Sequence, residues 1–134
     1  MGKVGVVIPC YNHGEFLAEA LESVTWQTVP VAHTVIVDDG SDKSGDAQAI
    51  YSGFRGQIPL NLVCLPYNRG PSHARNVGVE GLIELGCDYI LPLDADDVLE
   101  AECVETALKT IEGVDIAYPS YVYFGEKSGH VQWA

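Results

Sequence analysis

Three aspartates follow a short apolar run, and their types and spacing are suited to binding a cation. The run is residues 89–93, and the stretch YILPLDADD then adds Asp94, Asp96 and Asp97. In an extended segment residues i and i+2 point the same way, so Asp94 and Asp96 can present both carboxylates on one side of the small Ala95. Two hard oxygen donors suit Mg²⁺ or Mn²⁺, which prefer a few carboxylates together with phosphates and water.

The same aspartates could instead cap the helix that follows them. Asp97 fits this alternative best, because DVLE has the form of a capping box, with Asp97 at the N-cap and Glu100 three residues later. We therefore predict that Asp97 is a cap, that Asp96 is a metal ligand and that Asp94 faces a ligand. The capping alternative stays open for Asp94 and Asp96.

Two other apolar runs also end in residues that can bind a ligand. In HTVIVDDGSD, Asp38 and Asp39 are adjacent. Adjacent side chains of a strand point to opposite faces, so one aspartate can serve the turn while the other, which we predict to be Asp39, faces a cleft. Tyr11, in PCYN after the first run, is either a core residue or an exposed ring on which a base can stack.

Arginines interrupt the acidic pattern in YNRGPSHARN, residues 67–76. Arg69 and Arg75 lie around a Gly-Pro turn that opens a helix. Free N–H groups at a helix N-terminus and a guanidinium beside them suit a diphosphate, and the alternative is that both arginines are solvated surface residues. The motifs GxxxxGK[ST] and GxGxxG are absent, so the sequence indicates neither kinase-type nor NAD chemistry.

Alternating strands and helices must position these groups. Uncharged β-branched runs predict strands covered on both faces, and apolar residues at helical spacing predict the helices between them. Glycines 86 and 113 are predicted to end two of the helices. The predicted strands are 4–9, 33–39, 60–66, 89–93 and 114–124, the last able to pair with 130–134, and the predicted helices are 15–26, 42–54, 72–85 and 100–112.

This alternation predicts an α/β fold, a mostly parallel Rossmann-like sheet with helices on both faces. In open parallel sheets ligands bind beyond the carboxyl ends of the strands, where the strand order reverses. The loops PCYNHG, DDGSD and DADD would crowd one edge of the sheet, and six of the 19 acidic residues fall in the last two. We therefore predict a binding site at that edge.

Composition restricts the class of protein. The chain has 134 residues and is 47% hydrophobic, which predicts one domain with a packed core despite a net charge of −12. Neither a bilayer-spanning run nor a signal peptide is evident, so we expect a cytoplasmic protein. The four cysteines lack metal-ligand spacing and are predicted to be buried free thiols. No basic stripe is present, which argues against a nucleic-acid partner.

Four segments together resemble the nucleotide-binding half of a family 2 glycosyltransferase with the GT-A fold. They are VGVVIPCYNHGEFLAEALESVTWQT, VIVDDGSDKS, NRGPSHARNVG and YILPLDADD, in this order, within residues 4–97. The resemblance implies a metal-dependent, inverting transferase. Such an enzyme moves a sugar from a nucleotide diphospho-sugar, most often UDP-linked, to an acceptor hydroxyl on a polysaccharide, a lipid or a protein-linked glycan.

The resemblance also implies a set of base-binding residues. Carried over by position, Pro9, Tyr11 and Asn12 would line the nucleotide pocket, with Tyr11 against the base. Asp39 would hydrogen-bond the base.

A second implied set would contact the ribose and the diphosphate. Arg75 would lie near the nucleotide. Asp94 would approach the ribose, with Ala95 beside it, and Asp96 would hold Mn²⁺ or Mg²⁺ against the diphosphate. Asp94, Ala95 and Asp96 together match a DXD motif.

The sequence departs from the family pattern after the fifth predicted strand. Family catalytic domains are longer and take a carboxylate general base from that region, whereas Glu126 is the only acid here beyond Asp115. We expect an incomplete domain, with the base beyond Ala134, that binds donor without transferring sugar. An apolar edge at 114–124 and 130–134 would then favour self-association.

Three other classes of protein share some of these features. A non-catalytic nucleotide-sugar-binding module is favoured by the missing base and stays open. A receiver domain needs an acidic pair after the first strand and one aspartate after the third, where this chain has PCYN and LPYN. A sugar nucleotidyltransferase needs a glycine-rich basic loop after the first strand, which is absent.

Overall fold

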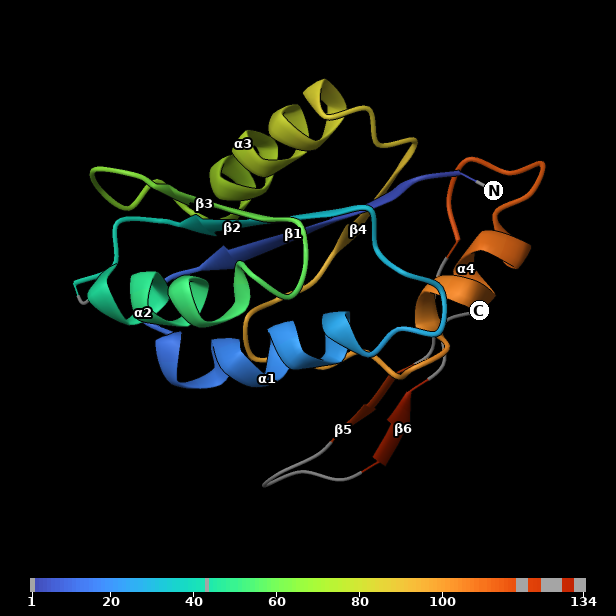
Figure 1. Ribbon diagram of the computed structural model, residues 1–134, viewed down its shortest axis with the longest axis horizontal. Helices are drawn as coiled ribbons and strands as arrows, with labels where there is room; N and C mark the ends of the chain where they lie inside the picture. The colour runs from blue at the N-terminus through green and yellow to red at the C-terminus, as the bar shows by residue number, and fades with distance from the viewer. Residues whose placement is uncertain (1, 43, 118–120, 124–128, 132–134) are drawn as a thin grey trace.

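A four-stranded parallel sheet forms the body of the protein (Figure 1). The computed structural model describes residues 2–42, 44–117, 121–123 and 129–131. Its strands are β1 (Val4–Cys10), β2 (His33–Asp38), β3 (Leu60–Cys64), β4 (Tyr89–Pro92), β5 (Tyr121–Tyr123) and β6 (Gly129–Val131), and its helices are α1 (Gly14–Thr25), α2 (Ser44–Phe54), α3 (Pro71–Glu84) and α4 (Cys103–Thr110).

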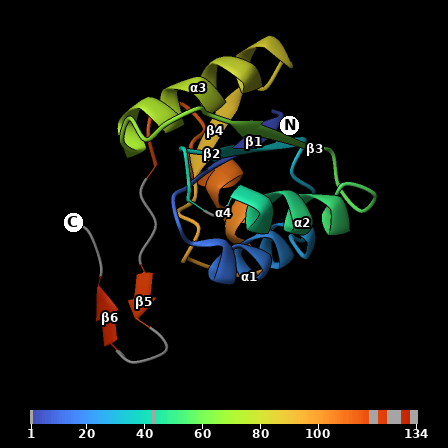
Figure 2. The same cartoon turned by 90° about the vertical axis from the view of Figure 1, so that its left-hand side faces the viewer.

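Helices cover both faces of this sheet, which confirms the predicted α/β class. Helix α3 lies on one face, and α1 and α2 lie on the other (Figures 1 and 2). The central strand β1 is therefore buried from both sides. Val6 and Ile8 belong to the core cluster that includes α1, whereas Val7, between them, belongs to the cluster that includes α3. This alternation follows from the two-residue period of a strand.

The strand order is β3-β2-β1-β4, so the direction of winding reverses between β1 and β4. All the pairings within this sheet are parallel, with Cys10 opposite Asp38 and Val7 opposite Pro92. The N–H of Leu93 donates to the carbonyl of Val7 at 2.9 Å, which carries the pairing one residue past β4. The loops that leave β1 and β4 consequently start beside each other.

The fifth predicted strand is wrong as a member of the parallel sheet. Residues 114–117 are not strand, and β5 instead pairs with β6 in an antiparallel hairpin that projects from the body (Figures 1 and 2). The predicted pairing with the tail is confirmed. A hairpin needs only a short turn, whereas a parallel strand needs a further crossover. Much of the expected apolar edge, at 118–120, 124–128 and 132–134, lies outside the described residues.

The predicted capping box at Asp97 is also wrong, because α4 begins only at Cys103. Gln27, which is buried just beyond α1, supplies hydrogen-bond partners for backbone groups at the start of α4. Its Oε1 accepts from the N–H of Val104 at 2.9 Å, and its Nε2 donates to the carbonyl of Glu100 at 2.7 Å. A distant buried amide therefore replaces the local cap, and Asp97 is left for another role.

The prediction of buried thiols holds for one of the four cysteines. Cys10 is buried, and this burial raises the pKa of its thiol. Cys64 is exposed because it ends β3, the edge strand, while Cys87 and Cys103 are half-buried.

Two glycines of α3 provide a matched test of how closely this helix packs on β1. A Cβ at Gly78 would lie 2.3 Å from Cγ2 of Val7, whereas a Cβ at Gly81 would meet nothing within 4 Å. We expect Gly78→Ala to lower the free energy of unfolding by about 1–3 kcal/mol through overpacking. Gly81→Ala should be neutral or stabilise by up to about 1 kcal/mol through helix propensity. Urea unfolding measures both, and equal stabilities would contradict the close approach of α3 to β1.

Candidate functional site

A cavity of about 560 Å³ opens where β1 and β4 end, beside the start of α3. We call it the β1–β4 cavity. Its position is the predicted one, at the carboxyl ends of the strands and at the reversal of strand order. Its walls come from four separate segments and comprise Pro9, Cys10, Tyr11, His13, Asp39, Asn68, Gly70, Pro71, Arg75, Asp94, Ala95 and Asp96.

Seven of the eight site residues expected from the sequence line this one cavity, and the exception is Asn12. Tyr11 is 41% exposed, so its ring is available to a ligand and is not a core residue. His13 and Asn68 also line the cavity, although neither is among the eight expected residues. The available signals were their positions, directly after the first strand and just before the Gly-Pro turn.

Asn12 lies at a second cavity of about 460 Å³, between the end of β1 and the start of α2. Its N–H donates to the Ser41 hydroxyl at 2.9 Å, and its side-chain oxygen accepts from the N–H of Asp42 at 3.1 Å. Its φ of 56° is in the left-handed region, which asparagine tolerates better than most residues. Asn12 therefore joins the loop after β1 to the loop after β2 and is not a wall of the β1–β4 cavity.

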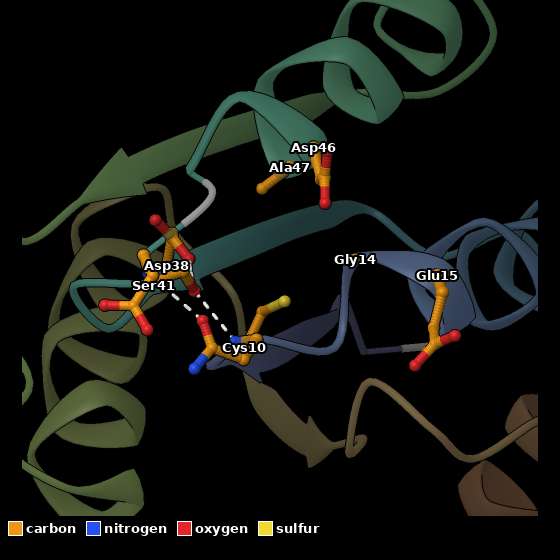
Figure 3. Close-up of a pocket in the computed structure, with 9 residues that line it drawn as sticks. Cys10, Gly14, Glu15, Asp38, Ser41, Asp46 and Ala47 are labelled. Carbon is orange, nitrogen blue, oxygen red and sulfur yellow. Dashed lines mark hydrogen bonds between the residues drawn. The ribbon is translucent and has the colours of Figure 1, made fainter.

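The second cavity, which we call the β1–α2 cavity, is acidic. In Figure 3 the side chains of Cys10 and Asp46 point into it. It is lined by Cys10, Asn12, Gly14, Glu15, Asp38, Ser41, Asp42, Asp46 and Ala47, none of which is basic. A diphosphate would be repelled there. The β1–β4 cavity, which contains Arg75, is the better place for an anion.

Asp38 and Asp39 divide between the two cavities, as the alternation of adjacent side chains predicts. Asp38 is buried, lines the β1–α2 cavity and accepts a hydrogen bond from the Ser41 hydroxyl. It thus serves the turn after β2. Asp39 is also buried but lines the β1–β4 cavity.

The carboxylate of Asp39 holds the segment that leads into α3. Its Oδ1 accepts from the N–H of Arg69 at 3.0 Å. Its Oδ2 accepts from the N–H of Gly70 at 2.9 Å and from the side-chain amide of Asn68 at 3.0 Å. These three bonds tie the end of β2 to residues 68–70. The first turn of α3, and Arg75 beyond it, are placed by this contact.

We expect Asp39→Asn to loosen the segment 68–70. The substitution replaces an acceptor oxygen with a donor NH₂ that must face existing donors, at a cost of about 1–3 kcal/mol of stability. Chemical denaturation measures the loss, and hydrogen exchange at Arg69 and Gly70 should accelerate. Asp42→Asn is the control, since it makes the same change on an exposed side chain of the same loop. Unchanged exchange in Asp39→Asn would show that the carboxylate does not hold the segment.

Asp94, Asp96 and Asp97 form an exposed cluster whose ligand oxygens all lie within 4.8 Å of one another. A turn brings them together, with the N–H of Asp97 donating to the carbonyl of Asp94 at 3.0 Å. Partial desolvation, with the Asp96 and Asp94 carboxylates nearby, raises the pKa of Asp97. Hard carboxylate oxygens at this spacing fit Mn²⁺ or Mg²⁺. Asp97, expected to be a cap, therefore joins the potential ligands.

The two arginines near α3 have different surroundings. Nη2 of Arg75 donates to Oδ1 of Asp94 at 2.9 Å, inside the β1–β4 cavity. Arg69 does not line the cavity, and its guanidinium carbon lies 5.8 Å from the ring centroid of Tyr67. Arg75, which the family resemblance places near the nucleotide, is the arginine of the two that contacts the acidic cluster.

Comparison with known protein families matches residues 5–134 to Glycosyl transferase family 2. The chain belongs to this family. Glycosyltransferase GlyA of Streptococcus pneumoniae is 35% identical over 95% of the chain, which spans 18% of GlyA. The minor teichoic acid biosynthesis protein GgaA of Bacillus subtilis is 31% identical over 92% of the chain, which spans 29% of GgaA.

Solved structures of similar sequence share the fold, which confirms its GT-A type. S. aureus TarS 1–349 in complex with UDP is 28% identical, with a TM-score of 0.72, over 82% of this chain and 32% of that one. The mannosyltransferase PcManGT from Pyrobaculum calidifontis, in complex with GDP-Man and Mn²⁺, is 26% identical, with a TM-score of 0.69, over 82% of this chain and 32% of that one. Among the described residues, none of the helices has the length and apolar character to cross a membrane.

Proposed function

We propose that the chain carries the donor site of a metal-dependent, inverting glycosyltransferase that uses a UDP-linked nucleotide diphospho-sugar. The observation that carries the proposal is the content of the β1–β4 cavity. An exposed aromatic ring, a buried carboxylate, an arginine and two of the three clustered aspartates, Asp94 and Asp96, line one space. Similar structures hold UDP, UDP-GlcNAc, or GDP-Man with Mn²⁺.

In this proposal the nucleoside lies between the ends of β1 and β2. The exposed ring of Tyr11 offers a face for the base, with Pro9 beside it. Asp39 is an acceptor for a base N–H, since Oδ1 has one protein donor and can accept a second. The rigid contact with residues 68–70 fixes this carboxylate before the base arrives.

The diphosphate would lie between the start of α3 and the acidic cluster. Arg75 and the N–H groups at the first turn of α3 are the positive groups that it would meet. Asp94, Asp96 and Asp97 would hold Mn²⁺ or Mg²⁺. When bound, the ion supplies Lewis-acid neutralisation of the charge that develops on the leaving nucleotide diphosphate.

We further propose a glycan or polymer hydroxyl as the acceptor. Relatives are named for minor teichoic acid biosynthesis and for poly-β-1,6-N-acetyl-D-glucosamine synthesis, the latter 32% identical over 72% of this chain. These names support an acceptor of that chemical class for the protein.

We expect UDP binding to depend on a divalent cation. A protein with a net charge of −12 repels a bare diphosphate, and an ion between the carboxylate cluster and the phosphates removes that repulsion. Calorimetry should show UDP affinity at least about tenfold higher in Mn²⁺ than in EDTA, a difference of about 1.4 kcal/mol. GDP and dTDP, titrated in parallel, report the preference for the base. Equal UDP affinity in EDTA and Mn²⁺ would refute the metal assignment.

Variants of the cluster test which carboxylates hold the ion. Asp96→Ala should abolish the effect of Mn²⁺ on UDP binding, and Asp97→Ala should weaken it. Each of these residues contributes one ligand oxygen to the cluster. Asp46→Ala removes the same charge from the β1–α2 cavity and should keep the effect. If Asp46→Ala lost the effect as Asp96→Ala did, net charge and not the cluster would control UDP binding.

A further inference from the structure

The ion pair between Arg75 and Asp94 engages a carboxylate of the proposed cation site. Oδ1 of Asp94 accepts from Arg75 at 2.9 Å, while the ligand oxygens of Asp94, Asp96 and Asp97 lie within 4.8 Å of one another. The side chains of Arg75 and Asp94 are 36% and 52% exposed. Exposed ion pairs of this kind are weak, so a stronger ligand can separate them.

Charge decides what happens when a divalent cation approaches this cluster. Arg75 is the only lysine or arginine among the residues that line the β1–β4 cavity. Without an ion, its guanidinium offsets part of the repulsion among three carboxylates. A guanidinium and a divalent cation on the same carboxylate would repel each other, so the cation must displace Arg75 or bind weakly beside it. A diphosphate supplies the anion to which a displaced Arg75 can move.

We propose that Arg75 is a positioning residue with two partners. It pairs with Asp94 when no cation is bound, and it moves to the diphosphate when nucleotide and cation bind together. This inference rests on the proposed function and deepens it. Arg75 opposes cation binding in the empty site and supports it once the nucleotide is present. Cation and nucleotide consequently strengthen each other's binding, and by linkage the factor is the same in both directions.

Mn²⁺ titration without nucleotide tests this inference directly. Free Mn²⁺ is followed by electron paramagnetic resonance in the unchanged chain and in Arg75→Met. We expect Arg75→Met to bind Mn²⁺ about threefold to tenfold more tightly, since it removes both a competing ion pair and a nearby positive charge. In the presence of UDP the order should reverse, with Arg75→Met binding Mn²⁺ more weakly than the unchanged chain.

Matched variants separate this role from a general effect of charge or folding. Arg69→Met removes the same charge from a side chain outside the cavity and should leave Mn²⁺ affinity unchanged. In an Asp94→Ala background, where the ion pair is already lost, Arg75→Met should tighten Mn²⁺ binding less than it does in the otherwise unchanged chain. Arg75→Lys keeps the charge without the planar guanidinium, and its Mn²⁺ affinity should lie between those of the unchanged chain and Arg75→Met. Circular dichroism confirms that each variant is folded.

The outcomes distinguish this inference from the proposed function. Metal-dependent UDP binding with equal or weaker Mn²⁺ affinity in Arg75→Met would overturn the inference and leave the donor site in place. Tighter Mn²⁺ binding in both Arg75→Met and Arg69→Met would also overturn it, because net charge alone would explain the gain. Absence of Mn²⁺ binding by every form would overturn the metal site and this inference together.

Discussion

Backbone pairing of β1 with β2 on one side and with β4 on the other is the constraint on which the site depends. Because both pairings are parallel, the loops that follow Cys10, Asp38 and Pro92 leave the sheet at the same edge. Burial by α3 on one face and by α1 on the other keeps β1 from shifting, since a one-residue slip would turn every side chain to the opposite core. The fold itself therefore sets the position of this edge.

A second layer of contacts converts that edge into a cavity. Asp39 binds residues 68–70, and Gly40 next to it approaches the Tyr67 backbone so closely that a Cβ would lie 2.3 Å from its carbonyl carbon. The φ of Gly40 is +71°, which also favours glycine. The start of α3 is therefore held against the end of β2, and Arg75 reaches the loop that follows β4.

The two cavities also differ in the charges of the residues that line them. The β1–α2 cavity gathers carboxylates with no basic residue in its walls, whereas the β1–β4 cavity contains Arg75 and the start of a helix. In an acidic protein a nucleotide diphosphate can bind only where its charge is offset. The proposed cation and Arg75 would both offset it, which is why their competition for Asp94 matters.

The sequence by itself determined the strands and helices of the sheet, the edge that carries the site and most of the cavity's residues. Each of these depends on local patterns, the two-residue and 3.6-residue periods and the polar residues at strand ends. Only the tertiary structure decided the surroundings of Asp97 and Asn12. Asp97 is not a cap, because Gln27, far away in the chain, accepts the hydrogen bond at the start of α4. Asn12 forms hydrogen bonds with the loop after β2. Such contacts join segments distant in sequence, and their geometry follows from packing that no local pattern encodes.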